Sequence, residues 1–116
     1  MSTYDLAHKL ADEIKNSDEY KDYQEKKQKI LDDEKAKDML LDYQKQEQKL
    51  QSKQMAGEEL SEDEKEEFEN LRNLIQMNNK ISEYLEAEQR VSVMLNDLQR
   101  ILFGDLEFGI IEEEKE

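Results

Sequence analysis

The chain has 116 residues, with 31 Asp and Glu residues against 17 Lys and Arg residues and a formal net charge of −14. It contains no Pro and only 3 Gly, which favours long uninterrupted helices over a turn-rich β architecture. The absence of Cys excludes a disulfide framework and a thiolate metal site, and the single histidine, His8, excludes a metal site that needs two histidines.

Two helices are predicted in the first third of the chain. The first covers about residues 3–16, where apolar residues recur at helical spacing, and Thr3 is its predicted N-cap. The second covers about residues 18–31 and begins after Ser17, a predicted N-cap that is followed by two acidic residues.

Two further helices are predicted in the middle of the chain. A long one covers about residues 33–56, and Gly57 supplies the left-handed backbone that commonly ends a helix. Ser61 and Glu64 have the spacing of a capping box, which marks the start of the fourth helix. That helix ends at a break around residues 77–79.

The fifth predicted helix, about residues 80–103, differs from the others in the width of its apolar face. At about 100° per residue its apolar side chains cover an arc of about 200°, whereas a surface helix needs only about 100°. Two sides of this helix must therefore be covered. Gly104 ends it. The side chains in the arc are Ile81, Tyr84, Leu85, Val91, Met94, Leu95, Leu98, Ile101, Leu102 and Phe103.

These segments predict an all-α fold, an elongated antiparallel bundle of about five helices, two of them long (about 33–56 and 80–103). Residues 1–103 form one helical domain, and residues 104–116 form an acidic C-terminal tail that is partly disordered. Two long rods share only a thin seam, so a monomer leaves part of the fifth helix bare. We therefore expect a homo-oligomer, and a dimer in the first place, because two-fold dimers are the commonest assemblies.

The fifth helix also carries the candidate interface. Five apolar side chains are its anchors, and Glu88 and Arg90 are its candidate polar contacts. Glu88 lies within the apolar arc, so its carboxylate has to be paired, hydrogen-bonded or protonated. One interpretation is a polar contact that fixes register or binds a partner; the other is a salt bridge or a residue at the edge of the packed region. The apolar anchors are Leu85, Val91, Leu95, Leu98 and Leu102.

Arg90 lies on the opposite face of the same helix. It is spaced i,i+4 from Glu86, and Arg100 is spaced i,i+3 from Asp97, as in ordinary helix-surface ion pairs. Only three Arg occur in the chain, and a guanidinium forms forked contacts that Lys cannot form. Two interpretations stay open: solvated pairs within the helix, or a clamp on another helix or subunit.

Two acidic blocks account for most of the net charge. Residues 58–69 carry eight acids and one Lys, and residues 104–116 carry six acids and one Lys. Such blocks are either solvated surfaces or docking sites for a basic partner.

Several classes of function are disfavoured by these residues. The chain has no Gly-rich phosphate loop and no convincing acid–base pair, so we expect a non-enzymatic protein without cofactor or metal. Its negative charge repels nucleic acid and anionic lipid, so we expect neither direct nucleic-acid binding nor membrane binding; RNA binding within a ribonuclease assembly is the alternative hypothesis. No apolar run is long enough for a membrane helix or a signal peptide, so we expect a cytoplasmic protein.

The order of several short motifs resembles the YlbF/YmcA family of small bacterial helical proteins, and its YheA-like branch in particular. The resemblance spans about residues 4–103. Its motifs are Tyr4-Asp5-Leu6-Ala7, then Lys53-Gln54-Met55 followed by Gly57-Glu58-Glu59, then Ala87-Glu88-Gln89-Arg90, Ser92, Leu95-Asn96-Asp97 and Arg100.

This resemblance implies an all-α fold, oligomeric assembly and a cytoplasmic home in Gram-positive bacteria. It also implies a link to a protein complex that steers an endoribonuclease in mRNA processing, with effects on competence, sporulation and biofilm formation; family relatives or that ribonuclease complex are then expected partners. Two features depart from the family. Relatives often place Pro after the Asn before the last helix, where this chain has Asn78-Asn79, and the iron–sulfur clusters of some relatives need cysteines that this chain lacks.

Overall fold

The computed structural model describes residues 1–107, and over them the chain forms five α-helices and no strand. The expected all-α fold is thereby confirmed. The part of the expected acidic tail that covers residues 108–116 lies outside the described residues. The helices are α1 (Thr3–Lys15), α2 (Asp18–Leu31), α3 (Glu34–Met55), α4 (Glu62–Met77) and α5 (Asn79–Phe103).

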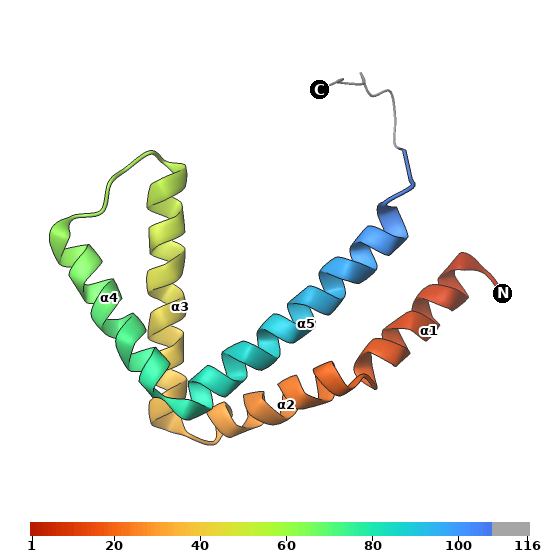
Figure 1. The fold of residues 1–116 in the computed structure, drawn as a ribbon, viewed down its shortest axis with the longest axis horizontal. Helices are drawn as coiled ribbons and strands as arrows, with labels where there is room; N and C mark the ends of the chain where they lie inside the picture. Colours follow the sequence, from red (N-terminus) through yellow and green to blue (C-terminus); the bar gives the residue numbers. More distant parts are fainter. Residues whose placement is uncertain (108–116) are drawn as a thin grey trace.

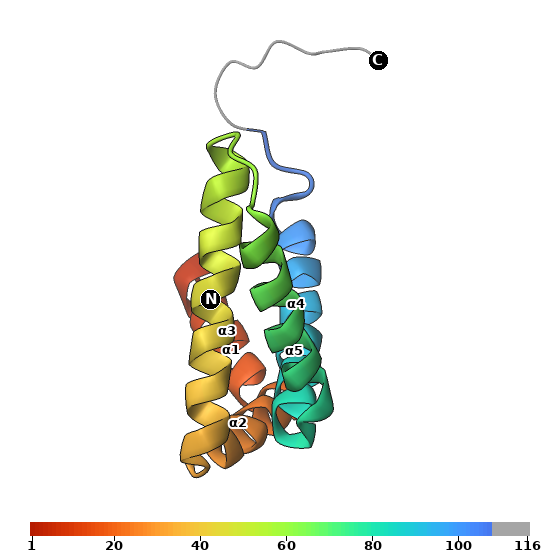
Figure 2. The same cartoon turned by 90° about the vertical axis from the view of Figure 1, so that its left-hand side faces the viewer.

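The helices form a V with two arms (Figure 1). In one arm α2 packs antiparallel against α5, and α1 continues the direction of α2 toward the tip; in the other arm α3 packs antiparallel against α4. Seen from the side, α3 and α4 lie next to each other in front of the first arm (Figure 2). The radius of gyration is 19.3 Å, well above the roughly 13–14 Å of a compact domain of this length.

The hydrophobic core is concentrated at the vertex of the V, where α2, α3, α4 and α5 meet. Each of these helices contributes at least one buried side chain, and Ile81 at the start of α5 is fully buried. The distal halves of both arms contribute none to this cluster. The vertex core therefore holds the two arms together. Its buried members are Ile30, Ala36, Leu40, Ile75, Ile81 and Tyr84.

Local capping chemistry explains most of the helix boundaries. The Ser17 hydroxyl accepts a hydrogen bond from the Tyr20 amide, and Ser61 and Glu64 form both bonds of the predicted capping box. Gly57 has φ of 73°, as expected for the residue that ends α3. These three predictions are confirmed.

The predicted N-cap of the first helix is wrong. Ser2, not Thr3, caps α1, because its hydroxyl accepts from the Asp5 amide while the Asp5 carboxylate accepts from the Ser2 amide. This reciprocal pair satisfies two backbone donors, whereas Thr3 would have no acid three residues onward.

The pairing of the two long helices also differs from the expected seam between two rods. The long helices α3 and α5 belong to different arms and approach each other only near the vertex (Figure 1). Each long helix instead packs on a shorter partner. The antiparallel arrangement of neighbouring helices is as expected.

The tip of the α3–α4 arm is joined by ion pairs across its loop. Lys53 Nζ donates to both Glu64 carboxylate oxygens at 2.7 and 2.6 Å, and Lys49 Nζ lies 3.4 Å from one of them. The hydrogen bond from Lys53, followed by that from the Ser61 amide, lowers the pKa of Glu64 to about 2 from a usual value of 4.5. Glu64 thus ties α4 to α3.

Replacing Glu64 by Gln should make a pH-dependent part of this stability disappear. Gln keeps the capping box but loses the charge, so the substitution isolates the ion pair. Because folding lowers this pKa, the charged form stabilises the fold fully above pH about 4.5 and progressively less as the pH falls toward about 2. The melting temperatures of wild type and Glu64→Gln should differ above pH 5 and converge in acid. A gap of constant size would contradict the assignment, and Glu66→Gln, on the exposed face, is the control.

Candidate interaction surface

The distal half of α5 carries several large apolar side chains that the rest of the described chain covers only in part. Five of its large apolar side chains are between 45% and 76% exposed, with Ile101 the most exposed. Single exposed apolar residues are common, but several large ones within about three turns of one helix are typical of an interaction site. We call this set the distal strip: Val93, Leu95, Ile101, Leu102 and Phe103.

The helix α1 is amphipathic, yet it buries none of its residues. Leu10 and Ile14 are half-buried, and Leu6 is 53% exposed. In Figure 1 α1 and the distal half of α5 both lie in the outer part of this arm, away from the vertex. Each carries large apolar side chains that are more than half exposed, such as Leu6 on α1 and Ile101 on α5.

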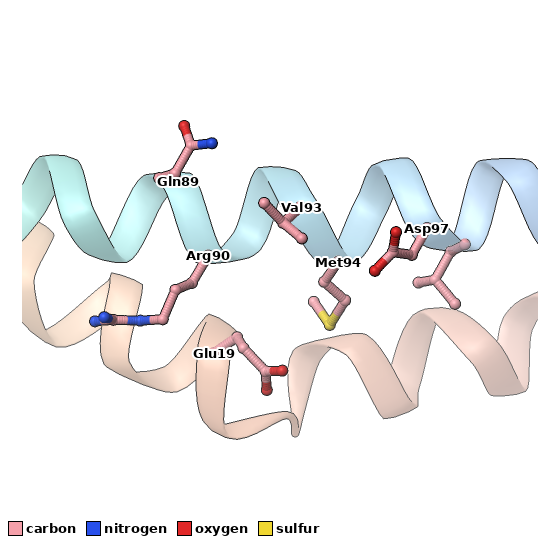
Figure 3. A pocket seen from close by; sticks show the side chains of 7 residues that line it. Glu19, Gln89, Arg90, Val93, Met94 and Asp97 are labelled. Carbon is pink, nitrogen blue, oxygen red and sulfur yellow. The ribbon is translucent and has the colours of Figure 1, made fainter.

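A groove lies where α5 faces the start of α2. It has a volume of about 400 Å³ and is lined mainly by α5, with Glu19 on the opposite side. Arg90 and Met94 extend from α5 toward α2, while Gln89 points away (Figure 3). Leu98 completes the lining toward the tip. The groove thus lies along α5 between its packed part and its exposed distal half.

The five predicted anchors lie at different depths. Leu85 packs partly against the vertex core, which makes it an intramolecular contact. Val91 and Leu98 are half-buried, whereas Leu95 and Leu102 are 45% and 51% exposed. Leu95 and Leu102 are consequently the anchors that remain accessible to a partner.

Glu88 is held by a hydrogen bond within the arm. The Tyr84 hydroxyl donates to Glu88 Oε2 at 3.2 Å, and it lies 3.3 Å from the Tyr23 hydroxyl of α2. Burial raises the pKa of the Tyr84 phenol, and the bond with Tyr23 and the charge of Glu88 raise it further. Glu88 is half-buried. This position agrees with the interpretation of Glu88 as a residue at the edge of the packed region.

Arg90 bridges α5 to α2. Its Nη2 donates to Asp22 Oδ2 at 2.8 Å, so of the two interpretations left open for Arg90 the structure shows a contact with another helix and not the pair with Glu86. The hydrogen bond from Arg90 lowers the pKa of the Asp22 carboxyl. Asp22 is 68 residues away in the chain, and its charge carries no signal that would have identified it among so many acids.

The expected ion pair between Asp97 and Arg100 on α5 is confirmed. The sequence placed Ile101 and Phe103 in the apolar arc of the fifth helix but not among its five anchors, and it indicated neither α1 nor Val93 as part of the surface. The apolar period of α1 and the apolar arc of α5 are visible in the sequence, but only the fold shows that both stay open. His8, on α1, is exposed.

The acidic block of residues 58–69 lies at the tip of the other arm, in the loop before α4 and its first turns. Every acid in it is exposed except Glu64, which is half-buried. Within residues 1–107 no three acidic or histidine side chains are placed to hold a metal ion. None of the described helices is both long enough and apolar enough to cross a membrane.

Over its described residues the chain is a small all-α protein in which five helices form a V and one arm exposes apolar side chains. The chain belongs to the YlbF/YmcA family: it matches the family described as "Control of competence regulator ComK, YlbF/YmcA" over residues 3–107. The sequence resemblance to this family is thereby confirmed.

The relatives of this chain are similar to it over most of their length. A UPF0342 protein of Halothermothrix orenii is 57% identical, and the alignment covers 99% of this chain and 98% of that protein. A UPF0342 protein of Desulfitobacterium hafniense is 39% identical, with 88% and 82% covered. A solved structure described as a protein of unknown function (DUF964) from Bacillus stearothermophilus superposes with a TM-score of 0.75 at 26% identity and covers 87% of this chain and 89% of that one.

Proposed function

We propose that this protein is a non-enzymatic interaction module that self-associates through its α1–α5 arm and docks to partner proteins in the cytoplasm. The observation that carries the proposal is the distal strip, in which Ile101 is 76% exposed and Phe103 53% exposed. Two-fold packing of two such arms would bring four helices together and cover the open side of each. A stable interface buries about 800 Å² per partner, and both α1 and the distal half of α5 have exposed apolar side chains to contribute to it.

The regulatory part of the proposal comes from the family. The family description refers to control of a competence regulator, and the sequence resemblance adds a link to RNA processing and developmental switches. A regulator of this kind works by binding other proteins, which suits a chain with a net charge of −14 better than direct RNA binding does.

Replacing Leu95 by Asp should convert the assembly to monomers. The substitution places a charge within the distal strip, and a charge buried in an apolar interface without a partner is costly. Light scattering should give the mass of a dimer for the wild type and about 13.9 kDa for Leu95→Asp.

The matched control is Leu74→Asp on α4, because Leu74 is 53% exposed on the other arm and should leave the mass unchanged. A monomeric wild type would overturn self-association. A Leu95→Asp variant that kept the dimer mass would place the interface outside the distal strip.

The docking part is tested by affinity capture of the tagged full chain from its native cytoplasm. Recovery of family relatives or of a ribonuclease above an untagged control would support the regulatory proposal. Recovery of the chain alone would contradict docking and leave self-association standing.

A further inference from the structure

A small apolar notch lies near the vertex between the end of α2 and the start of α3. Its volume is about 140 Å³, close to that of a cavity that holds a benzene ring. Buried Ile30, Leu40 and Tyr84 form its floor. Leu31 and Leu41 line its sides and remain 47% and 46% exposed. The notch is therefore matched in size and chemistry to one large apolar side chain.

The mouth of the notch is basic. Lys27 of α2 and Lys37 of α3 both line it, and within residues 1–107 neither forms an ion pair. Gln44 adds a neutral polar group. In a chain of net charge −14, two lysines beside an apolar opening favour a ligand that carries an apolar side chain followed by carboxylates.

The C-terminal residues of this chain have that chemistry. Residues 108–111 are Phe, Gly, Ile and Ile, and residues 112–114 are three consecutive Glu. We propose that the notch binds the C-terminal segment 108–116 of a second copy of this chain, with one of Phe108, Ile110 or Ile111 in the notch and the glutamates beside Lys27 and Lys37.

The segment has to come from a second copy, because residues 108–111 cannot reach the notch of the same chain. Tyr84 and Phe103 are 19 residues apart on α5, about 29 Å along the helix axis, and residues 104–107 continue away from the vertex (Figure 1). Ile111 lies four residues beyond Glu107, so it can be at most ~14 Å from it. The contact requires two copies but not the distal strip, so it is separate from the proposed arm interface. One side chain and a short segment bury far less than the roughly 800 Å² per partner of a stable interface, so this contact alone does not hold two chains together in the light-scattering experiment.

A fluorescently labelled peptide of residues 105–116, titrated with the full-length protein and followed by anisotropy, tests this proposal. We expect saturable binding that weakens at least about tenfold when Lys27 and Lys37 are both changed to Glu, since two attractive contacts become repulsive. The matched control changes Lys29 and Lys35 to Glu, because these exposed lysines lie two residues away on other faces of the same helices. That variant carries the same net charge and should bind within about twofold of the wild type.

Three results would overturn the proposal. They are no saturable binding, equal weakening by both double variants, and equal binding of a scrambled peptide of the same composition. A peptide with Ile110 and Ile111 changed to Ser should bind more weakly than the native one. The Leu95→Asp variant should bind the native peptide as the wild type does, so failure of the arm interface and failure of the notch are read separately.

Discussion

Replacing Ile81 by Ala should lower the free energy of unfolding by about 2–5 kcal/mol, the range measured for such truncations in well-packed cores. Ile81 is 0% exposed and lies in the one cluster that joins the two arms. Its loss leaves a cavity that neighbours on four helices cannot easily fill. Urea denaturation at a fixed protein concentration measures the effect, because self-association would add concentration-dependent stability.

The control for this experiment is Leu74→Ala on α4. Leu74 is 53% exposed, so truncating it removes less buried surface and should cost clearly less than the Ile81 variant. Equal losses at both positions would show that the vertex core does not dominate the stability of the fold.

Enlarging Ala87 to Leu should destabilise the α2–α5 packing by about 1–3 kcal/mol, as overpacking of a core does. Ala87 is 0% exposed. Contacts from α2 to Tyr84 and to Arg90 lie on both sides of it, so α2 covers this part of α5. Since Ala and Leu both have high helix propensity, the cost comes from the lack of space and not from the helix itself.

Ala11→Leu on α1 is the matched control, because Ala11 is exposed and mid-helix. Thermal denaturation should show a lower melting temperature for Ala87→Leu and little change for Ala11→Leu. An unchanged melting temperature for Ala87→Leu would mean that the space between α2 and α5 can hold the larger side chain at no cost in stability. That result would contradict the close packing of the two helices.

The helices themselves could be predicted from the sequence because their ends are set by local chemistry. Ser17, Gly57 and the Ser61–Glu64 capping box each act within a few residues, and each was found where the pattern places it. The error at Thr3 has the same local origin, since Ser2 and Asp5 compete with it for the cap.

The arrangement of the helices could not be predicted in the same way. Arg90 binds Asp22 across 68 residues, and Lys80 binds Asp33 across 47. The chain has 31 acidic residues, and the sequence does not distinguish these two as partners. A narrow stripe such as that of α3 is compatible with more than one partner helix. The wide face of α5 did indicate an uncovered surface, but its open distal half is a consequence of where the other helices pack.

Because the two arms are held together at the vertex, a small rotation there produces a larger displacement at their tips. The helix α5 has 25 residues and is about 37 Å long, so a rotation of about 5° at the vertex would move its tip by about 3 Å. The size of the side chains at the junction of α2 and α3 therefore affects the distance between the tips of the two arms, although these side chains contact neither tip. In this fold a change of one side chain's volume at the vertex is amplified into the spacing between the acidic loop and the end of α5.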